Sequence, residues 1–144
     1  MSAESFKAYL GRVQTSVKQK SDGIQIAALK SLEGELKTRI FNNGKATNGT
    51  SIGYYTIAYG DYREDSGKQA QYVDLQFDGN LIKSIQVGKS QGRNVLGFIN
   101  GYQRKIAEGN QRRFKKRIFY LTKKEAEDLA KRTGLEIRKA IRSV

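Results

Sequence analysis

The spacing of apolar residues divides the chain into helical ends and a strand-forming middle. Near the start, apolar residues recur at three- and four-residue intervals, as expected for the buried stripe of a helix. A break at residues 20–23 predicts two helices there, since Ser21 or Asp22 could cap the second one. Asn42, Asn43 and Gly44 predict the end of that helix, because Asn and Gly tolerate the left-handed backbone conformation. The two stripes consist of Phe6, Tyr9, Leu10, Val13 and Val17, and of Ile26, Leu29, Leu32 or Glu33, Leu36 and Ile40.

The middle third has the period of two that is typical of β-strands. Apolar and polar side chains alternate between residues 72 and 77, which predicts a strand with one buried and one solvent-facing side. The buried side would consist of Val73, Leu75 and Phe77, and the solvent-facing side of Asp74 and Gln76. A turn is expected at residues 78–79. Residues 82–88 and 94–101 form two further runs, joined by a Gly-containing loop that favours a hairpin.

The last third predicts a polar helix, a short apolar segment and an amphipathic helix. Residues 103–114 are expected to be helical, and residues 118–121 to form a short buried strand or an extended approach to the last helix. Thr122 and Glu125 have the spacing of a capping box. The apolar stripe of the last helix would consist of Ala126, Leu129, Ala130, Thr133 or Gly134, Ile137 and Ile141.

These patterns together predict one α+β domain over residues 1–144. It would have two N-terminal helices, a small and mostly antiparallel β-sheet, and a C-terminal helix packed on the sheet. Residues 1–41 would be the helical part, residues 42–101 the loop and sheet part, and residues 102–144 the basic helical part. The loop at residues 42–51, rich in Gly and Asn, is expected to become ordered only against a neighbouring molecule.

Missing residue types limit the chemistry that the chain can perform. The chain has no cysteine and no histidine, which removes thiolate metal sites and the usual acid–base residue near neutral pH. Carboxylates are then the only candidates for a metal or hydrolytic site, but their spacing lacks the calcium-loop pattern. We therefore expect solvated loop carboxylates, no metal, no cofactor and no enzymatic activity. The carboxylates in question are Asp61, Glu64, Asp65, Asp74 and Asp78.

Positive charge is concentrated toward the C-terminus. The net charge is +13, and residues 101–144 hold 14 Lys and Arg against 5 Asp and Glu, a net of +9. A dense basic cluster attracts phosphate or an acidic protein surface over roughly 8 to 10 Å at ordinary salt. We expect the cluster to bind an acidic partner surface, with a merely solvated face as the alternative, and we expect Phe114 in its middle to anchor it to the core. The basic cluster consists of Arg112, Arg113, Lys115, Lys116 and Arg117.

Four tyrosines lie close together in the middle of the chain, at positions 54, 55, 59 and 62. Tyrosines interleaved with basic residues can stack nucleic-acid bases, but no Lys or Arg lies between Lys45 and Arg63. Burial in the domain or at a subunit interface is therefore the favoured interpretation. Tyr55 and Tyr59 are the aromatic residues that we expect to bind a partner.

The order of residues from 42 to 87 resembles the tail-completion or virion-morphogenesis family of tailed bacteriophages. In that pattern a helix ends in a Gly-containing loop, and a Tyr, Tyr, Arg, Gly segment, a VDLxxxGxLxxSxxV strand and a Phe-x-Leu-Ser/Thr-x-x-Glu helix start follow. The resemblance spans roughly residues 25–140. It breaks at residues 102–109, where many members carry His-Glu or Asn-Glu and then Gly. The matching residues are Gly44, Gly49, Tyr55, Tyr59, Arg63, Gly67, Val73, Asp74, Leu75, Gly79, Leu81, Ser84 and Val87, then Phe119, Leu121, Thr122 and Glu125.

The resemblance implies a structural virion protein of the head-to-tail connector. Such a protein forms a homo-oligomeric ring that completes the tail or joins it to the portal side, and it is assembled in the cytoplasm of the bacterial host. Its partners would be other connector, portal or tail proteins, with genomic DNA nearby. No membrane is expected, because no apolar run approaches the roughly 20 residues that span a bilayer. Charge alone would favour an alternative, a basic nucleic-acid-binding protein, and a hydrolase or nuclease is the third possibility.

Overall fold

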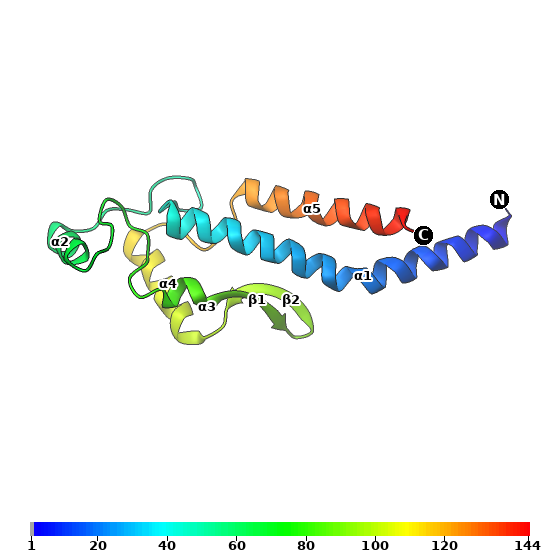
Figure 1. Ribbon diagram of the computed structural model, residues 1–144, viewed down its shortest axis with the longest axis horizontal. Coiled ribbons are helices and arrows are strands. Elements are labelled where there is room, and N and C mark those ends of the chain that lie inside the picture. Colours follow the sequence, from blue (N-terminus) through cyan, green and yellow to red (C-terminus); the bar gives the residue numbers. More distant parts are fainter. Residues whose placement is uncertain (1) are drawn as a thin grey trace.

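One long helix, α1 (Ala3–Lys37), forms the axis of the molecule (Figure 1). The computed structural model describes residues 2–144. α1 has 35 residues, which corresponds to roughly 50 Å at the usual rise per residue. It continues into a short π-helix, η1 (Thr38–Asn42). The C-terminal helix α5 (Lys123–Arg142) runs antiparallel along α1, and a β-hairpin lies against another side of α1. The predicted α+β class is therefore confirmed.

The prediction of two N-terminal helices is wrong, because α1 passes through residues 20–23 without a break. Ser21 does not cap a second helix, since its hydroxyl donates to the Lys18 carbonyl one turn back. The Asp22 carboxylate instead accepts a hydrogen bond from Lys89 in the hairpin, at 2.8 Å. A Gly inside a helix costs only about 1 kcal/mol relative to Ala. Packing of α5 and the hairpin along α1 therefore outweighs the weak local break at Gly23.

The N-terminal part of α1, before Ser16, projects beyond its helical partner α5. The end of α5 reaches Ser16, whose hydroxyl donates to the Ala140 carbonyl at 3.2 Å. Phe6 and Leu10, which precede Ser16 in the helix, are 51% and 45% exposed. The apolar stripe predicted for this segment is present, but within residues 2–144 much of it is not packed against another element.

The predicted hairpin is confirmed and is the whole of the sheet among residues 2–144. Strand β1 (Ile85–Ser90) pairs antiparallel with β2 (Arg93–Phe98), with Ile85 opposite Phe98. The turn is shorter than expected and has two central residues, Gln91 and Gly92, with φ angles of 50° and 74°. Two successive positive φ angles match the twist of the strands. The short helix α3 (Asn80–Ser84) replaces the start of the run predicted at residues 82–88.

The strand predicted at residues 72–77 is absent, and the predicted sides of that segment are only partly correct. Leu75 has a left-handed φ of 54°, which interrupts the alternation of a strand. Val73 is buried as predicted, but Asp74 is only 5% exposed and Phe77 is 38% exposed. Asp74 turns inward because an arginine side chain provides an opposite charge inside the domain.

The core lies where the end of α1 meets the central loops. The loop at residues 42–51 is fixed within the subunit, contrary to the prediction that it needs a neighbour. Ala46 is fully buried, its N–H donates to the Thr50 carbonyl, and the Thr47 N–H donates to the Arg117 carbonyl at 2.9 Å. The buried core cluster comprises Leu36, Ile40, Phe41, Ala46, Ile52, Val73, Leu81, Ile85, Ala107 and Ile118.

The C-terminal third contains helix α4 (Gly101–Phe114), an extended segment and α5. The capping box of Thr122 and Glu125 is confirmed, and Glu125 also accepts a hydrogen bond from Arg39 at 2.7 Å. α5 packs mainly on α1 and also contacts the sheet. Its predicted stripe is only partly covered, since Ala126 and Ala130 are exposed. Among residues 2–144, no helix is both long enough and apolar enough to cross a bilayer.

Candidate functional site

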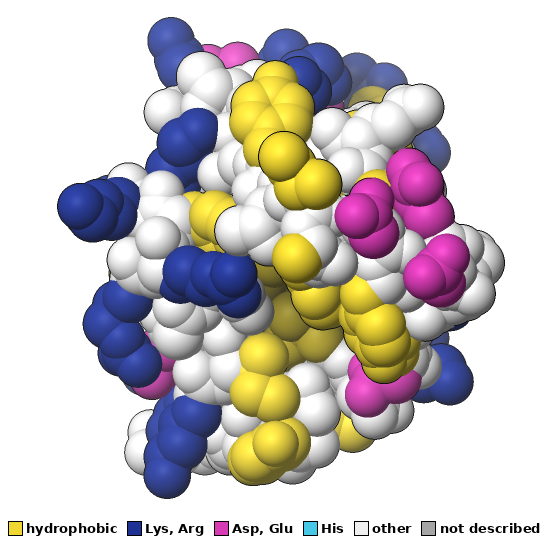
Figure 2. All heavy atoms as spheres, turned by 90° about the vertical axis from the view of Figure 1, so that its left-hand side faces the viewer, with side chains coloured by type: hydrophobic (Ala, Val, Ile, Leu, Met, Phe, Trp, Pro, Cys, Tyr) yellow, Lys and Arg dark blue, Asp and Glu magenta, His cyan; other side chains and the backbone are white. Residues whose placement is uncertain are grey.

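An aromatic cleft of about 600 Å³ opens at the end of the molecule opposite the N-terminus. It lies between helix α2 (Ile57–Asp65), the loop before α3, and α4. Figure 2 shows the cleft from this end as a hollow with hydrophobic side chains in and around it. Its main aromatic and aliphatic lining consists of Tyr55, Tyr59, Phe77, Tyr102, Ile106 and Phe114.

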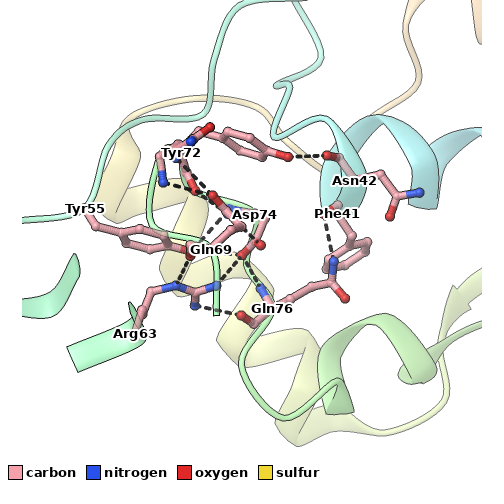
Figure 3. Close-up of polar contacts among 9 residues, drawn as sticks. Phe41, Asn42, Tyr55, Arg63, Gln69, Tyr72, Asp74 and Gln76 are labelled. Atoms are coloured by element: carbon pink, nitrogen blue, oxygen red, sulfur yellow. Dashed lines mark hydrogen bonds and ion pairs between the residues drawn. The ribbon is translucent and has the colours of Figure 1, made fainter. Parts of the chain in front are cut away.

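A buried ion pair holds the α2 side of the cleft in place (Figure 3). α2 starts at Thr56, whose hydroxyl accepts from the Tyr59 N–H, and it directs Arg63 inward. Arg63 Nη2 lies 3.1 Å from Asp74 Oδ1, and the two side chains are 2% and 8% exposed. The other guanidinium nitrogens donate to the carbonyls of Gln69 and Gln76 at 2.8 and 2.7 Å. A buried charge must be paired and hydrogen-bonded to be tolerated, and Arg63 meets both conditions.

The buried network also connects the cleft to the end of α1. Gln69 donates to Asp74 Oδ2 at 2.7 Å. Gln76 Nε2 donates to the Phe41 carbonyl at 2.8 Å, and the Tyr72 hydroxyl donates to the Asn42 carbonyl at 2.6 Å. The loop at residues 66–77 has no regular secondary structure. Its position therefore depends on these side-chain contacts rather than on a β-ladder.

Tyr55 belongs to the same network and is half-buried beside the cleft. Its hydroxyl donates to Asp74 Oδ1 at 3.0 Å and accepts from the Asp74 N–H at 3.2 Å. The Arg63 guanidinium carbon lies 4.5 Å from the centre of the Tyr55 ring. Burial of the phenol is the main reason why the pKa of Tyr55 is raised to about 12, and the neighbouring Asp74 charge adds to it.

This shift predicts a loss of stability at high pH. The pKa of Tyr55 is about 12 in the folded chain against an ordinary value of 10.0, so the unfolded chain loses this proton first. The stabilisation that comes from keeping Tyr55 protonated is fully present below pH 10 and is lost as the pH rises toward about 12. The stability of the wild type should therefore fall relative to that of Tyr55→Phe as the pH rises above 10, which thermal melts of the two proteins over this range can measure. A difference that stays constant over this range would contradict the predicted pKa.

Aromatic rings continue from Tyr55 outward along the edge of the cleft. The ring centres of Tyr55 and Tyr59 are 5.3 Å apart, those of Tyr59 and Tyr62 are 6.0 Å apart, and those of Tyr62 and Phe77 are 5.7 Å apart. Tyr62 is 54% exposed and Tyr59 is 37% exposed. The row thus begins in the buried network and ends at solvent, where its rings are available to a partner.

The structure brings together some of the predicted binding residues and separates others. Tyr55, Tyr59 and Arg113 line the cleft. Lys116 points to the opposite loop and donates to the Ser51 carbonyl and the Thr50 hydroxyl. The Arg117 guanidinium lies 4.9 Å from the centre of the Tyr120 ring. Two members of the basic cluster therefore have contacts within the fold.

The remaining members end α4 and face solvent. Arg112 and Lys115 are exposed, and Lys115 closes the helix in a left-handed conformation with φ 52°. Phe114 packs against the core, as predicted for the anchor of this segment. Among residues 2–144, no member of the basic cluster forms an ion pair with a carboxylate.

The carboxylates considered for a metal site are separated in the structure. Asp74 is committed to Arg63, whereas Asp61, Glu64 and Asp65 lie exposed on α2. Within residues 2–144, no three His, Cys, Asp or Glu residues come close enough to hold a metal ion. The arrangement brings aromatic and charged side chains together on one surface at this end of the molecule.

Comparison of the chain with models of protein families, with curated proteins and with solved structures finds no match.

Sequence reasoning missed the pairing of Arg63 with Asp74 and the contribution of α4 to the cleft. An Asp between Val73 and Leu75 is compatible with two arrangements, a solvent-facing side chain or a buried one paired with a cation. The sequence does not show which arginine would be that cation. The sequence analysis also did not predict that Tyr102 and Ile106 line the cleft. Their one-turn spacing on a polar helix is the signal that could have found them.

Proposed function

We propose that this protein is a structural subunit of the head-to-tail connector of a tailed bacteriophage. It forms part of a ring that completes the tail or joins it to the portal side, and it acts by binding without catalysis. The observation that carries the proposal is the convergence of residues from the connector-like pattern. Tyr55, Arg63 and Asp74 are up to 19 residues apart in the sequence, yet they meet in one buried contact.

Other residues of the pattern also have definite structural requirements. Its glycines at 44, 49, 67 and 79 have φ angles of 61°, 82°, 72° and 80°, all in the region that favours glycine. Leu81 and Ser84 are buried, and the Ser84 hydroxyl donates to the Leu81 carbonyl. These residues have defined roles in the fold, which supports the proposal, although the strand that the pattern implies at residues 73–75 is not formed.

The exposed end of the molecule supports a binding role. Aromatic residues and arginine are enriched in the cores of protein interfaces, and the cleft contains Tyr59, Tyr102 and Arg113. The partners would be other connector, portal or tail proteins at the head–tail junction of the virion, with genomic DNA nearby. The cationic segment at the end of α4 would then face an acidic protein surface.

A triple variant tests this role. Changing Arg112, Arg113 and Lys115 to Gln should leave the melting temperature of the isolated subunit unchanged or slightly higher, because it relieves repulsion between like charges. The variant retains Lys116 and Arg117, which have contacts within the fold. In a phage that depends on this protein, the yield of joined, infectious particles should fall, and separate heads and tails should accumulate.

The matched control removes the same charge from α5. Lys131, Arg138 and Arg142 are exposed or partly exposed and form no ion pair within residues 2–144, so changing them to Gln should leave assembly intact. Normal joining by the α4 variant would remove the basic cluster from the docking surface. Tight retention of a monomer on DNA, with steep loss of affinity as salt rises, would instead favour the nucleic-acid-binding alternative.

A further inference from the structure

We infer that the aromatic cleft is one side of a contact between two copies of this chain. In this contact, the acidic surface of α2 on one copy docks on the basic end of α4 on the next copy. The inference rests on the proposed ring and names the surfaces that would close it. It follows from two sets of unpaired charges of opposite sign that share the same end of the subunit.

The acidic surface consists of the exposed carboxylates of α2. Asp61, Glu64 and Asp65 form no ion pair within residues 2–144. The one basic residue of α2, Arg63, is 2% exposed and is neutralised by Asp74. Glu64 and Asp65 also lie in the last turn of the helix, where the helix dipole disfavours negative charge. These two carboxylates therefore destabilise the isolated subunit. A cationic side chain of another molecule that paired with them would remove this cost.

The basic surface lies across the cleft from α2. Arg113 lines the cleft from α4, and Arg112 and Lys115 lie exposed beside it in the sequence. Figure 2 shows Lys and Arg side chains gathered on one side of the hollow and Asp and Glu side chains on the other. Among the described residues 2–144, the two sets form no ion pair with each other. A second copy, presenting its acidic side to the basic side of the first, would satisfy both sets.

The placement of the two surfaces determines the kind of assembly. Each copy would use one surface toward its left neighbour and a different one toward its right neighbour, which is a heterologous contact. Both surfaces lie at the same end of the elongated subunit. Repeating the contact therefore places the copies side by side rather than end to end, and it closes a ring when the rotation between neighbours divides a full turn.

Exposed apolar side chains at the same end supply the area that such a contact would bury. Ile57 is 85% exposed, Tyr54 is 76% exposed and Tyr102 is 73% exposed. Large apolar side chains with a charged rim around them are the usual composition of a specific interface. The charges would then set which surfaces meet, and the aromatic residues would provide affinity.

Charge reversal tests the inference. The first variant carries Asp61→Lys, Glu64→Lys and Asp65→Lys, and the second carries Arg112→Glu, Arg113→Glu and Lys115→Glu. Within the part of the chain that the structure describes, the six side chains form no hydrogen bond or ion pair, so both variants should fold, as circular dichroism can verify. Light scattering coupled to size-exclusion chromatography should show that the wild type associates with rising concentration. Each variant should associate roughly a hundredfold more weakly or not at all.

Restoration is the decisive measurement. A chain that carries all six substitutions has the same two surfaces with their signs exchanged, and it should associate like the wild type. An equimolar mixture of the two variants should also associate, because each then meets an opposite charge on both sides. The inference is overturned if either reversal associates normally, if the combined chain does not recover, or if the wild type stays monomeric up to millimolar concentration.

These outcomes are separable from those of the connector proposal. A contact between copies through another surface would leave both reversals associated, while loss of particle joining in the Arg112, Arg113 and Lys115 to Gln variant could still occur. Conversely, recovery of association in the combined chain, together with normal particle joining by the Gln variant, would retain the contact between copies in solution and show that joining requires neither this contact nor the basic cluster.

Discussion

Replacing Asp74 by Asn should lower the free energy of unfolding by about 3 to 5 kcal/mol, since it leaves a buried arginine without its counter-charge. Arg63 is 2% exposed, and among residues 2–144 its one salt-bridge partner is Asp74. The substitution keeps the shape of the side chain, so the loss measures the charge rather than a cavity. Chemical denaturation followed by circular dichroism is the appropriate measurement.

Two further variants show whether the loss comes from the buried charge. Asp61→Asn removes a carboxylate from exposed α2 and should change the free energy of unfolding by no more than about 0.5 kcal/mol. The double variant Arg63→Met with Asp74→Leu removes both charges and should cost less than the sum of the single changes. If Asp74→Asn melted like Asp61→Asn, the ion pair would not be what holds the loop at residues 66–77.

The second large effect is expected from Gly44→Ala, with a loss of about 2 to 5 kcal/mol. Gly44 has φ 61°, where a residue with a Cβ is strained by about 1 to 2 kcal/mol. An added Cβ would also meet the Tyr72 ring and lie 2.7 Å from the Val73 carbonyl oxygen. Overpacking of this kind typically lowers the free energy of unfolding by about 1 to 3 kcal/mol more.

Gly49→Ala is the matched control for the steric part of this effect. Gly49 has a similar φ of 82°, but an added Cβ there meets no atom within 4 Å. Gly49→Ala should therefore lower the free energy of unfolding only by the backbone strain, about 1 to 2 kcal/mol. Equal losses at the two positions, measured by thermal unfolding, would show that the segment around Tyr72 moves aside and does not pack against Gly44 as described.

The elements that the sequence predicted correctly are those that local interactions determine. The capping box at Thr122 and Glu125 is formed within four residues, and the hairpin depends on a turn of two residues between two short strands. The stop after α1 depends on Gly44 and its left-handed φ. Each of these features can be stabilised by neighbours in the sequence, so composition and spacing are sufficient to find them.

The candidate site was only partly predictable for the same reason. Tyr59 and Arg113 were expected to bind a partner, and they do lie on one cleft, although 54 positions separate them in the sequence. Nothing in the local pattern places α2 opposite α4. Tyr55 was expected to bind a partner as well, and it lies half-buried with its hydroxyl bonded to Asp74.

By itself, the sequence determined the α+β class, the helix boundaries near residues 42–44 and 122–125, the hairpin, and the excess of positive charge toward the C-terminus. Only the tertiary structure decided that α1 continues through Gly23, because α5 and the hairpin pack along it and offset a weak local break. It also decided that Asp74 is buried, since Arg63 compensates for its charge 11 residues away. Alternation of polar and apolar residues predicts which side chains face water only when the polar residues have no buried partner. Whether such a partner is present depends on the folded chain.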